Sequence, residues 1–252
     1  MRAGIRVTAA IALLTIAGVD RAHAQTAARN DRVGISLNAG VQPSPISFDS
    51  STTQPVYLES SVLDTAYEVR NGLLVDGGVR YRIGGDFGIG AAVSWFSTKN
   101  DATVNATLPH PFFFRTPRSI EGAATGLQRE EIVAHLQATY AIRPTARLEV
   151  TFAGGPSFFR ASQAFVESVS YTDSYPYDAP AFTAAASTRV RGNRTGFNAG
   201  ADVGMRLSRH AGVGGLVRFS RARIPFVLPN GGTTVTSDAG GVQVAGGVRL
   251  YF

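Results

Sequence analysis

The sequence predicts an all-β protein: an eight-stranded antiparallel up-and-down transmembrane β-barrel preceded by a signal peptide. Eight segments alternate apolar residues with small or polar ones at a period of two, as in strands that bury one face. Long polar loops and short turns join these segments in strict alternation, the arrangement expected of a transmembrane barrel. An export signal at the start of the chain and an aromatic residue at its end agree with this fold.

Residues 1–24 have the features of a secretory signal peptide. Two arginines precede an apolar run at residues 7–19, and Ala22-His23-Ala24 offers a cleavage site of the small-x-small type. The apolar run is shorter than the ~20 residues that a transmembrane helix needs. An uncleaved anchor is the alternative, but the flanking residues favour cleavage. We therefore expect the barrel to comprise residues 25–252.

The composition restricts the possible partners. The chain has 24 Lys and Arg, 18 Asp and Glu, and no Cys, so neither disulfides nor a lipoprotein anchor is expected. Its formal net charge is +6, and removal of the predicted signal peptide leaves 21 basic and 17 acidic residues, or +4. The basic residues form no cluster in the sequence, and export argues against a nucleic-acid partner.

The first three expected strands lie in the first 95 residues. In residues 33–42, apolar side chains alternate with Gly, Ser, Asn and Gln, and a polar loop follows at residues 43–68. Residues 69–82 set Val, Leu and Tyr against Arg and Asp, and Gly84-Gly85-Asp86 then turns the chain. Residues 87–95 oppose bulky apolar side chains to Gly, Ala and Ser, which completes the third strand.

The fourth and fifth strands follow a second long loop at residues 99–129. The fourth, residues 132–142, sets an apolar face against His, Gln and Thr. A turn at Arg143–Ala146 leads to the fifth, residues 148–158, where Leu, Val and Phe oppose Glu, Thr and small residues. The pairing of a long loop with a short turn is thus repeated.

The longest loop, residues 161–194, precedes the last three strands. Its segments 164–169 and 182–190 alternate well enough to extend the neighbouring strands above the membrane. The remaining strands and their connections are residues 197–207, a turn at 209–210, residues 213–220, a loop at 223–239 and residues 240–252.

Two other folds share part of this pattern. A soluble sandwich or barrel also alternates, but the export signal, the terminal Phe and the unequal loops favour a transmembrane barrel. The expected strands are long enough to cross a bilayer at a tilt, which takes ~9–11 residues. Ten crossing strands would require one more pair of strands, for which the sequence shows no further short turn.

The closing segment carries a family resemblance. Gly240–Phe252 alternates to its end and resembles the C-terminal strand of bacterial outer-membrane β-barrels, although Ala245 stands where that family often has a polar residue. The mature chain as a whole resembles the small OmpA/OmpX-like barrels that lack a periplasmic domain. This resemblance implies a monomer in the outer membrane of a Gram-negative cell. It also implies two partners, the membrane lipids and the barrel-assembly machinery, which would bind the C-terminal strand.

No catalytic, cofactor-binding or metal-binding residues are expected. Gly88-Ile89-Gly90 is half of a dinucleotide fingerprint, but a strand follows where a helix is required. His135 points into the barrel and has Gln137 two residues on, whereas lipid A deacylases have an outward His and Ser at that spacing. His110 and His210 have no further ligands at metal-binding spacing. We expect no enzyme, and a hydrogen-bonded interior histidine.

The inward face carries charges of both signs. They line a conduit, or they fill a small barrel as ion pairs; filling is favoured because a narrow interior is nearly dry. The set comprises Arg70, Asp76, Arg80, Arg82, Glu149, Asp202, Arg206, Arg218 and Arg249.

Two loop segments are unusually apolar, Phe112–Phe114 and Ile224–Leu228. They form an exposed interaction site, or they pack on each other and cap the barrel mouth, which is the favoured interpretation. The expected function is a structural or surface-interaction role through long extracellular loops, with a surface partner at those loops. The alternative is a narrow channel or a conduit for small, including hydrophobic, molecules.

Overall fold

The computed structural model describes residues 31–43, 45–229 and 233–252. The predicted signal peptide lies outside the described residues. Among the described residues, no helix is long and apolar enough to span a membrane. The ten strands of the described chain are β1 (Val33–Gln42), β2 (Ile46–Val56), β3 (Glu59–Val69), β4 (Gly72–Gly84), β5 (Phe87–Leu108), β6 (Arg118–Ile142), β7 (Leu148–Thr172), β8 (Ala181–Arg206), β9 (Ala211–Val227) and β10 (Thr234–Tyr251).

Eight of these strands close a ring, which confirms the predicted barrel. All neighbours pair antiparallel in the order β1-β4-β5-β6-β7-β8-β9-β10, and β10 returns to β1. The closing ladder joins the two ends of the chain, with Gly34 opposite Tyr251 and Val41 opposite Val244. Backbone bonds between Val33 and Phe252 continue it beyond the last strand. A closed ring leaves no edge strand within this part of the molecule.

The remaining two strands correct the prediction of a loop at residues 43–68. β2 and β3 form a hairpin, and β3 pairs with the upper half of β5, from Val62–Thr107 to Glu68–Asp101. Polar Ser and Thr alternate with a few buried residues here, and β-branched Thr suits a strand as well as a loop. The predicted second strand therefore starts at Gly72 instead of Val69.

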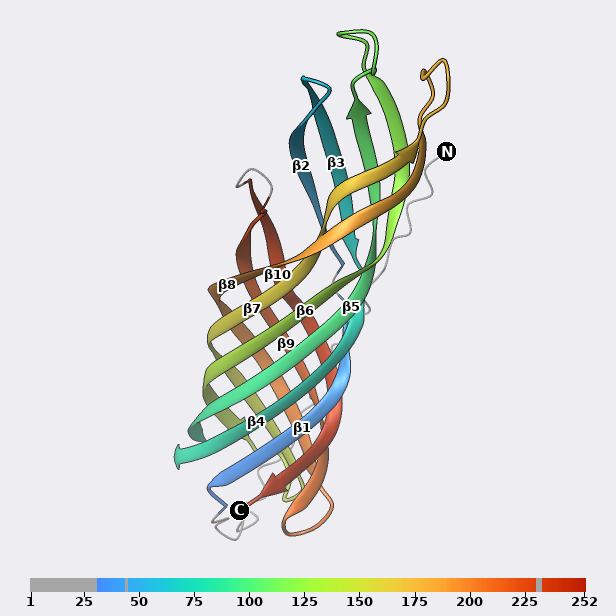
Figure 1. The fold of residues 1–252 in the computed structure, drawn as a ribbon. Helices are drawn as coiled ribbons and strands as arrows, with labels where there is room; N and C mark the ends of the chain where they lie inside the picture. The colour runs from blue at the N-terminus through green and yellow to red at the C-terminus, as the bar shows by residue number, and fades with distance from the viewer. Residues whose placement is uncertain (1–30, 44, 230–232) are drawn as a thin grey trace, which may run out of the picture.

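The hairpin belongs to a tall extension that stands above one end of the ring (Figure 1). β5 to β8 are 22 to 26 residues long, about twice what a membrane crossing requires. The predicted extension of two strands through residues 164–169 and 182–190 is confirmed, because β7 runs to Thr172 and β8 begins at Ala181. The predicted loop at residues 99–129 shortens to residues 109–117 for the same reason.

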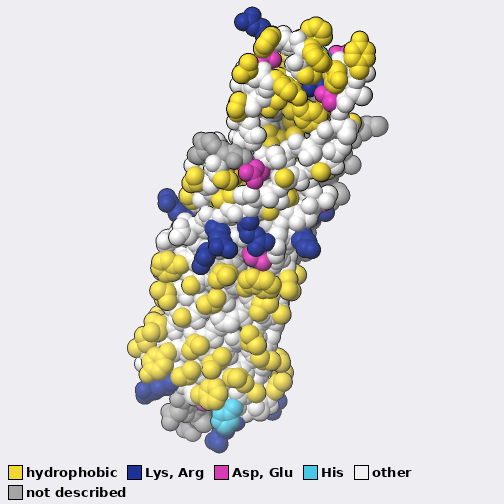
Figure 2. Space-filling model, in the orientation of Figure 1, with side chains coloured by type: hydrophobic (Ala, Val, Ile, Leu, Met, Phe, Trp, Pro, Cys, Tyr) yellow, Lys and Arg dark blue, Asp and Glu magenta, His cyan; other side chains and the backbone are white. Residues whose placement is uncertain are grey.

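The outer surface of the ring is an apolar girdle (Figure 2). Every ring strand contributes exposed aliphatic or aromatic side chains from the face that the alternation assigned to lipid. Their polar neighbours in sequence point inward and are buried. The upper rim of this girdle is formed by Val41, Leu73, Trp95, Ile132, Phe158, Phe197, Phe219 and Val242.

The extension has the opposite polarity, with an apolar interior and a polar exterior. Phe48 and Tyr67 stack at 4.8 Å, and both contact Phe165, which in turn contacts Phe226. Burial raises the pKa of the Tyr67 phenol above its usual value, and its hydroxyl accepts a hydrogen bond from the backbone N–H of Val166. This second core closes the interior above the girdle.

Candidate functional site: a filled lumen and an aromatic apex

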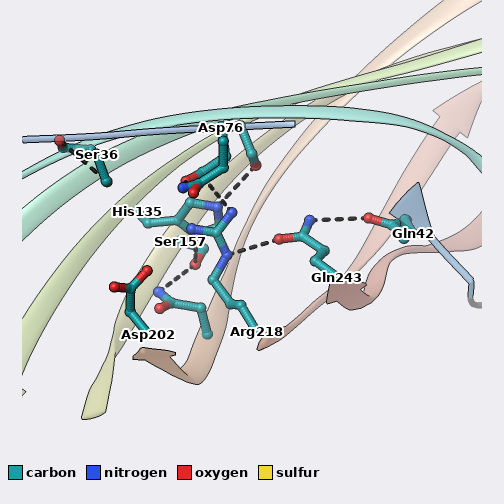
Figure 3. Close-up of polar contacts among 12 residues, drawn as sticks. Ser36, Gln42, Asp76, His135, Ser157, Asp202, Arg218 and Gln243 are labelled. Atoms are coloured by element: carbon teal, nitrogen blue, oxygen red, sulfur yellow. Dashed lines mark hydrogen bonds and ion pairs between the residues drawn. The ribbon is translucent and has the colours of Figure 1, made fainter. Parts of the chain in front are cut away.

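A chain of buried polar side chains crosses the lumen at the level of the girdle (Figure 3). Arg218 of β9 donates to Asp76 of β4 at 2.6 Å and to Gln243 of β10 at 2.8 Å. Gln243 donates to Gln42 of β1 at 3.0 Å, and Asn38 donates to the other Asp76 oxygen at 3.1 Å. The five side chains are each at most 2 % exposed, so the charges are neutralised by one another and not by water.

His135 lies beside this chain, inside the barrel as predicted. Its Nε2 is 3.1 Å from Ser94 Oγ, and its Nδ1 is 2.8 Å from Ser157 Oγ. Asn198 donates to Ser157 Oγ at 2.8 Å, which anchors the second serine. Both ring nitrogens are thus occupied by hydroxyl groups, and neither is bonded to a carboxylate. This is the arrangement of a satisfied interior histidine.

A second charged layer lies nearer the short turns. Arg249 binds Asp202, Arg80 binds Glu149, and Arg143 also donates to Glu149 at 2.9 Å. A cavity of about 90 Å³ lies among the side chains of these two layers, and its lining also includes Leu216 and Tyr251. Of the predicted interior charges, this layer and the first contain Asp76, Arg80, Glu149, Asp202, Arg218 and Arg249.

The other three predicted charges have different positions. Arg206 is buried and binds Asp31 at 2.6 Å, at the end of the ring near the short turns. Arg82 is half-buried. Arg70 was assigned wrongly to the interior: it lies between β3 and β4, is exposed, and binds Asp101 at 3.4 Å. The shifted start of β4 is the cause.

Sequence reasoning missed a buried ion pair where the ring meets the extension. Arg129 and Glu131 of β6 contact each other at 2.8 Å, and both are almost fully buried. Arg129 also donates to Ser237 Oγ and to the Asp238 carbonyl, while Glu131 accepts from the Gly240 N–H. An acid and a base two residues apart share one strand face, and this signal was available in the sequence.

These layers support a prediction about transport. An eight-stranded ring leaves room only for side chains, and this one holds two charged layers. The Arg129–Glu131 pair lies above them, and the apolar core of the extension closes the interior further up. We expect no stable ion conductance from the purified protein in planar bilayers, with a 16-stranded porin as the positive control. Steady, ion-selective openings would contradict the filled-lumen interpretation.

The far end of the extension forms the second candidate site, which we call the apex: residues 57–58, 109–117 and 173–180. Leu58 is 95 % exposed, Tyr175 is 87 % exposed, and Phe112–Phe114 are 63–72 % exposed. Ile224, Phe226 and Leu228 are instead buried in the core of the extension. The prediction that the two apolar segments pack on each other is therefore wrong, because Phe112–Phe114 lie in the apex whereas Ile224, Phe226 and Leu228 pack inside the extension.

Contacts between the three connections hold the apex together. The Arg115 N–H donates to Glu59 at 2.8 Å, and Arg118 donates to Asp173 at 2.6 Å and to the Tyr177 carbonyl. Phe112 packs against Tyr177 with ring centroids 5.4 Å apart. Burial and a hydrogen bond with Tyr57 raise the pKa of Tyr171, which links the β2–β3 turn to the end of β7.

His110 organises the aromatic segment itself. Its side chain is buried, and its Nδ1 accepts hydrogen bonds from the N–H groups of Phe112 and Phe113 at 3.1 and 3.2 Å. Its ring also lies 4.8 Å from the ring of Phe113. These contacts make His110 an anchor for the loop. Within the described chain, no group of three or more His, Asp or Glu is placed to hold a metal ion.

Backbone strain is concentrated in the apex. Four non-glycine residues of the described chain have positive φ: Tyr57 (50°), Leu58 (67°), Arg115 (59°) and Tyr177 (71°). All four lie in the apex connections. Such conformations cost of order 1–3 kcal/mol each and cluster at binding and switch regions.

Comparison with known proteins identifies the fold. No protein-family model and no curated protein sequence matches the chain. Among similar solved structures, the outer membrane protease OmpT from Escherichia coli is 10 % identical, with 89 % of this chain and 98 % of that chain covered and a TM-score of 0.51. The outer membrane protein OprG from Pseudomonas aeruginosa is 10 % identical, with 88 % of this chain and 97 % of that chain covered and a TM-score of 0.47. Neisserial surface protein A is 15 % identical, with 87 % of this chain and 97 % of that chain covered and a TM-score of 0.39. At these identities the likeness concerns the fold alone. The closed ring and its apolar girdle thus give this chain the fold of a small bacterial outer-membrane β-barrel, and the likeness to OmpT agrees with that fold.

Proposed function

We propose that the protein is an outer-membrane barrel with a surface-interaction role, and that the apex is its binding surface. The observation that carries this proposal is the concentration of all four positive-φ non-glycine residues among exposed aromatic side chains. Strain and exposed apolar surface both lower stability, so a chain retains them together where a function requires them. The alternation of long loops and short turns directs the extension toward the cell exterior.

The apex has the properties of a recognition surface. Aromatic side chains supply large contact areas at a low cost in conformational entropy, and they dominate binding energy at interfaces. The extension is continuous β-structure up to this surface, so the aromatic groups are presented on a rigid support. A rigid surface loses less entropy on binding than a set of mobile loops would. These properties favour a macromolecular partner with an apolar patch of its own.

Catalysis is not part of this proposal. OmpT is a protease, but at 10 % identity that activity does not transfer to this chain. The histidine in the lumen is flanked by two serines and lies between buried layers, where a macromolecular substrate has no access. We accordingly propose a non-enzymatic protein.

The same proposal includes two further partners and an oligomeric state. Membrane lipids cover the girdle, and the barrel-assembly machinery binds the C-terminal strand, whose Phe252 side chain is exposed. The closed ring has no free edge in the girdle, which favours a monomer. The alternative function, a conduit for small molecules, is disfavoured because side chains fill the lumen.

Site-specific photo-crosslinking in intact cells tests the apex. A photoreactive phenylalanine analogue replaces Phe113, and in a control protein it replaces Thr103, which is exposed on the side of β5. We expect discrete crosslinked products from position 113 and none from position 103. Leu58→Ser should abolish them without changing the amount of folded barrel. Equal products from both positions, or none from either, would contradict an apex-centred interaction.

A further inference from the structure

The apex contains nearly all of the large apolar surface that the extension exposes, and Figure 2 shows hydrophobic side chains gathered at this end of the molecule. Tyr57, Leu58, Phe112–Phe114 and Tyr175 are exposed there. Within the described residues, Val227 is the one other large apolar side chain exposed above the girdle. Proteins seldom expose a contiguous apolar patch unless a partner covers it. The patch lies at the end of the extension, so that partner must approach end-on.

The backbone of the aromatic segment makes its hydrogen bonds within the apex and its border. In residues 112–115, three N–H groups donate to His110 Nδ1 or to the Glu59 carboxylate. The Phe114 carbonyl accepts from the Thr116 hydroxyl at 3.4 Å. An apolar surface that covers this segment therefore leaves these four backbone groups satisfied, whereas an unpaired buried N–H or C=O would oppose binding. A fitting partner needs apolar packing and few hydrogen bonds.

The apex also exposes charges of both signs. Arg115 lies in the β5–β6 connection and Asp178 in the β7–β8 connection, and both are exposed. Asp178 remains 70 % exposed although it lies 3.7 Å from His110 Nε2, whereas the ion pair of Arg118 with Asp173 is largely buried. A surface with one exposed base and one exposed acid is complementary to itself when a two-fold axis relates two copies, because each base can meet the acid of the other copy.

We propose that the apex binds the apex of a second copy of this chain, end to end. This inference rests on the proposed function and names its partner. The second copy offers what the contacts above require: an apolar patch, backbone groups that are already paired, and charges of both signs. In a two-fold arrangement, Arg115 of each copy faces Asp178 of the other, and every contact occurs twice.

The direction of the apex decides which copies can meet. The extension continues away from one end of the ring, and the apex is the part most distant from the ring (Figure 1). Barrels in one membrane share one orientation, so their apices point in the same direction and do not face each other. Two apices meet head-on when the copies lie in two apposed membranes. The interaction is therefore a contact between neighbouring cells.

The size of the patch predicts a weak contact for each pair of copies. A fully buried aromatic side chain contributes about 150–250 Å², so covering Phe112–Phe114, Tyr175 and Leu58 would bury roughly 600 Å² per copy. A standard stable interface buries about 800 Å² per partner. Many copies on each surface strengthen the contact between two membranes, because the first pair raises the effective concentration of the next.

Pairing between vesicles of two colours tests the inference with purified protein alone. The protein is refolded into phosphatidylcholine vesicles, and dual-colour fluorescence cross-correlation measures how many vesicles of one colour bind the other. Thr103→Cys in every sample supplies the one cysteine of the chain, on the exposed side of β5. A membrane-impermeant dye on this cysteine counts the copies whose extension faces outward, so samples are compared at equal numbers of accessible apices.

We expect wild-type vesicles to pair with wild-type vesicles and not with protein-free ones. Phe113→Ser should lower the pairing affinity on the order of 30-fold, as for an aromatic hot spot at an interface. The matched control is Val227→Ser, because Val227 is also an exposed apolar residue of the extension but lies outside the apex. It should change the affinity by less than about two-fold.

Charge exchange makes the test specific for a second copy. Arg115→Asp and Asp178→Arg should each lower pairing within their own population by about ten-fold, because like charges then face each other. Vesicles with Arg115→Asp on one colour and Asp178→Arg on the other should recover most of the wild-type pairing. In that mixture, opposite charges face each other again at both contacts of the two-fold arrangement.

The possible failures separate this inference from the proposed function. Pairing of wild-type vesicles with protein-free vesicles would overturn the inference and make the apex a lipid-binding surface. No recovery in the mixture of charge variants would overturn the two-fold contact between apices. Absence of wild-type pairing would overturn the inference as well. Crosslinks from position 113 to a different protein in intact cells would then leave the proposed function standing, and absence of such crosslinks would remove both.

Discussion

Replacing Asp76 with Ala should destabilise the barrel by about 3–5 kcal/mol, because it removes the carboxylate that neutralises Arg218. Both side chains are 2 % exposed and contact each other at 2.6 Å. In the variant, the guanidinium would keep Gln243 as a neutral partner and would remain a buried charge without a counter-ion. The amide nitrogen of Asn38 would also lose its acceptor, Asp76, although the amide oxygen would still accept a hydrogen bond from Arg249.

The measurement is equilibrium unfolding in lipid vesicles, followed by the fluorescence of Trp95, the single tryptophan of the chain. Asp238→Ala is the matched control, because it also removes a carboxylate from an arginine, but from a solvent-exposed pair. That change should cost less than about 1 kcal/mol. The double change Asp76→Ala/Arg218→Met should recover much of the loss, since it removes the unpaired charge as well. A loss below 1 kcal/mol for Asp76→Ala would show that water screens the lumen.

The ring could be predicted from the sequence because one physical rule governs all eight of its strands. A side chain in the girdle faces either lipid or a narrow lumen, so apolar residues alternate with polar or small ones along most of each strand; Leu74, Phe96 and Val133, which are apolar and buried, are exceptions near the top of the ring. Ile132, His135 and Leu136 of β6 follow the rule, and the structure places each on the expected face. The interior position of His135 followed from parity alone.

The extension was less predictable because the polarity of the two strand faces reverses at the top of the girdle. In β5, Val93 and Trp95 face outward and Ser94 faces inward, whereas higher up Val104 is buried and Thr103 is exposed. The backbone alternation continues through this reversal, but the pattern of apolar residues changes phase. In a sequence such a phase change resembles the end of a strand, which is why residues 99–129 were predicted to be a loop.

A bulge in β6 adds a second discontinuity. Leu127 pairs with Asn100 and Ala124 pairs with Ala102, so one extra residue is accommodated near Gly126, whose φ is +72°. A glycine adopts this conformation without the penalty that a Cβ would impose. The apex contacts could not be predicted at all, because the pairing of Arg118 with Asp173 depends on how tall the β5–β6 and β7–β8 hairpins become.

The lipid-facing surface supports the second large expected effect. Val93→Arg should cost about 2–4 kcal/mol, because Val93 is 54 % exposed in the girdle and an arginine there must reach through the apolar layer to water. Thr103→Arg is the matched control on the same strand and the same outward face, ten residues further along, in the extension. It should change stability by no more than about 0.5 kcal/mol.

The comparison of these two variants locates the membrane boundary on β5. Both introduce the same side chain on the same strand and leave the lumen unchanged, so their difference reports the surroundings of the outer face alone. Unfolding in lipid vesicles gives the free energies, and the same pair measured in detergent tests the role of the bilayer, since a detergent belt deforms more easily around a charge. A silent Val93→Arg together with a costly Thr103→Arg would mean that the extension, and not the ring, lies in the apolar layer.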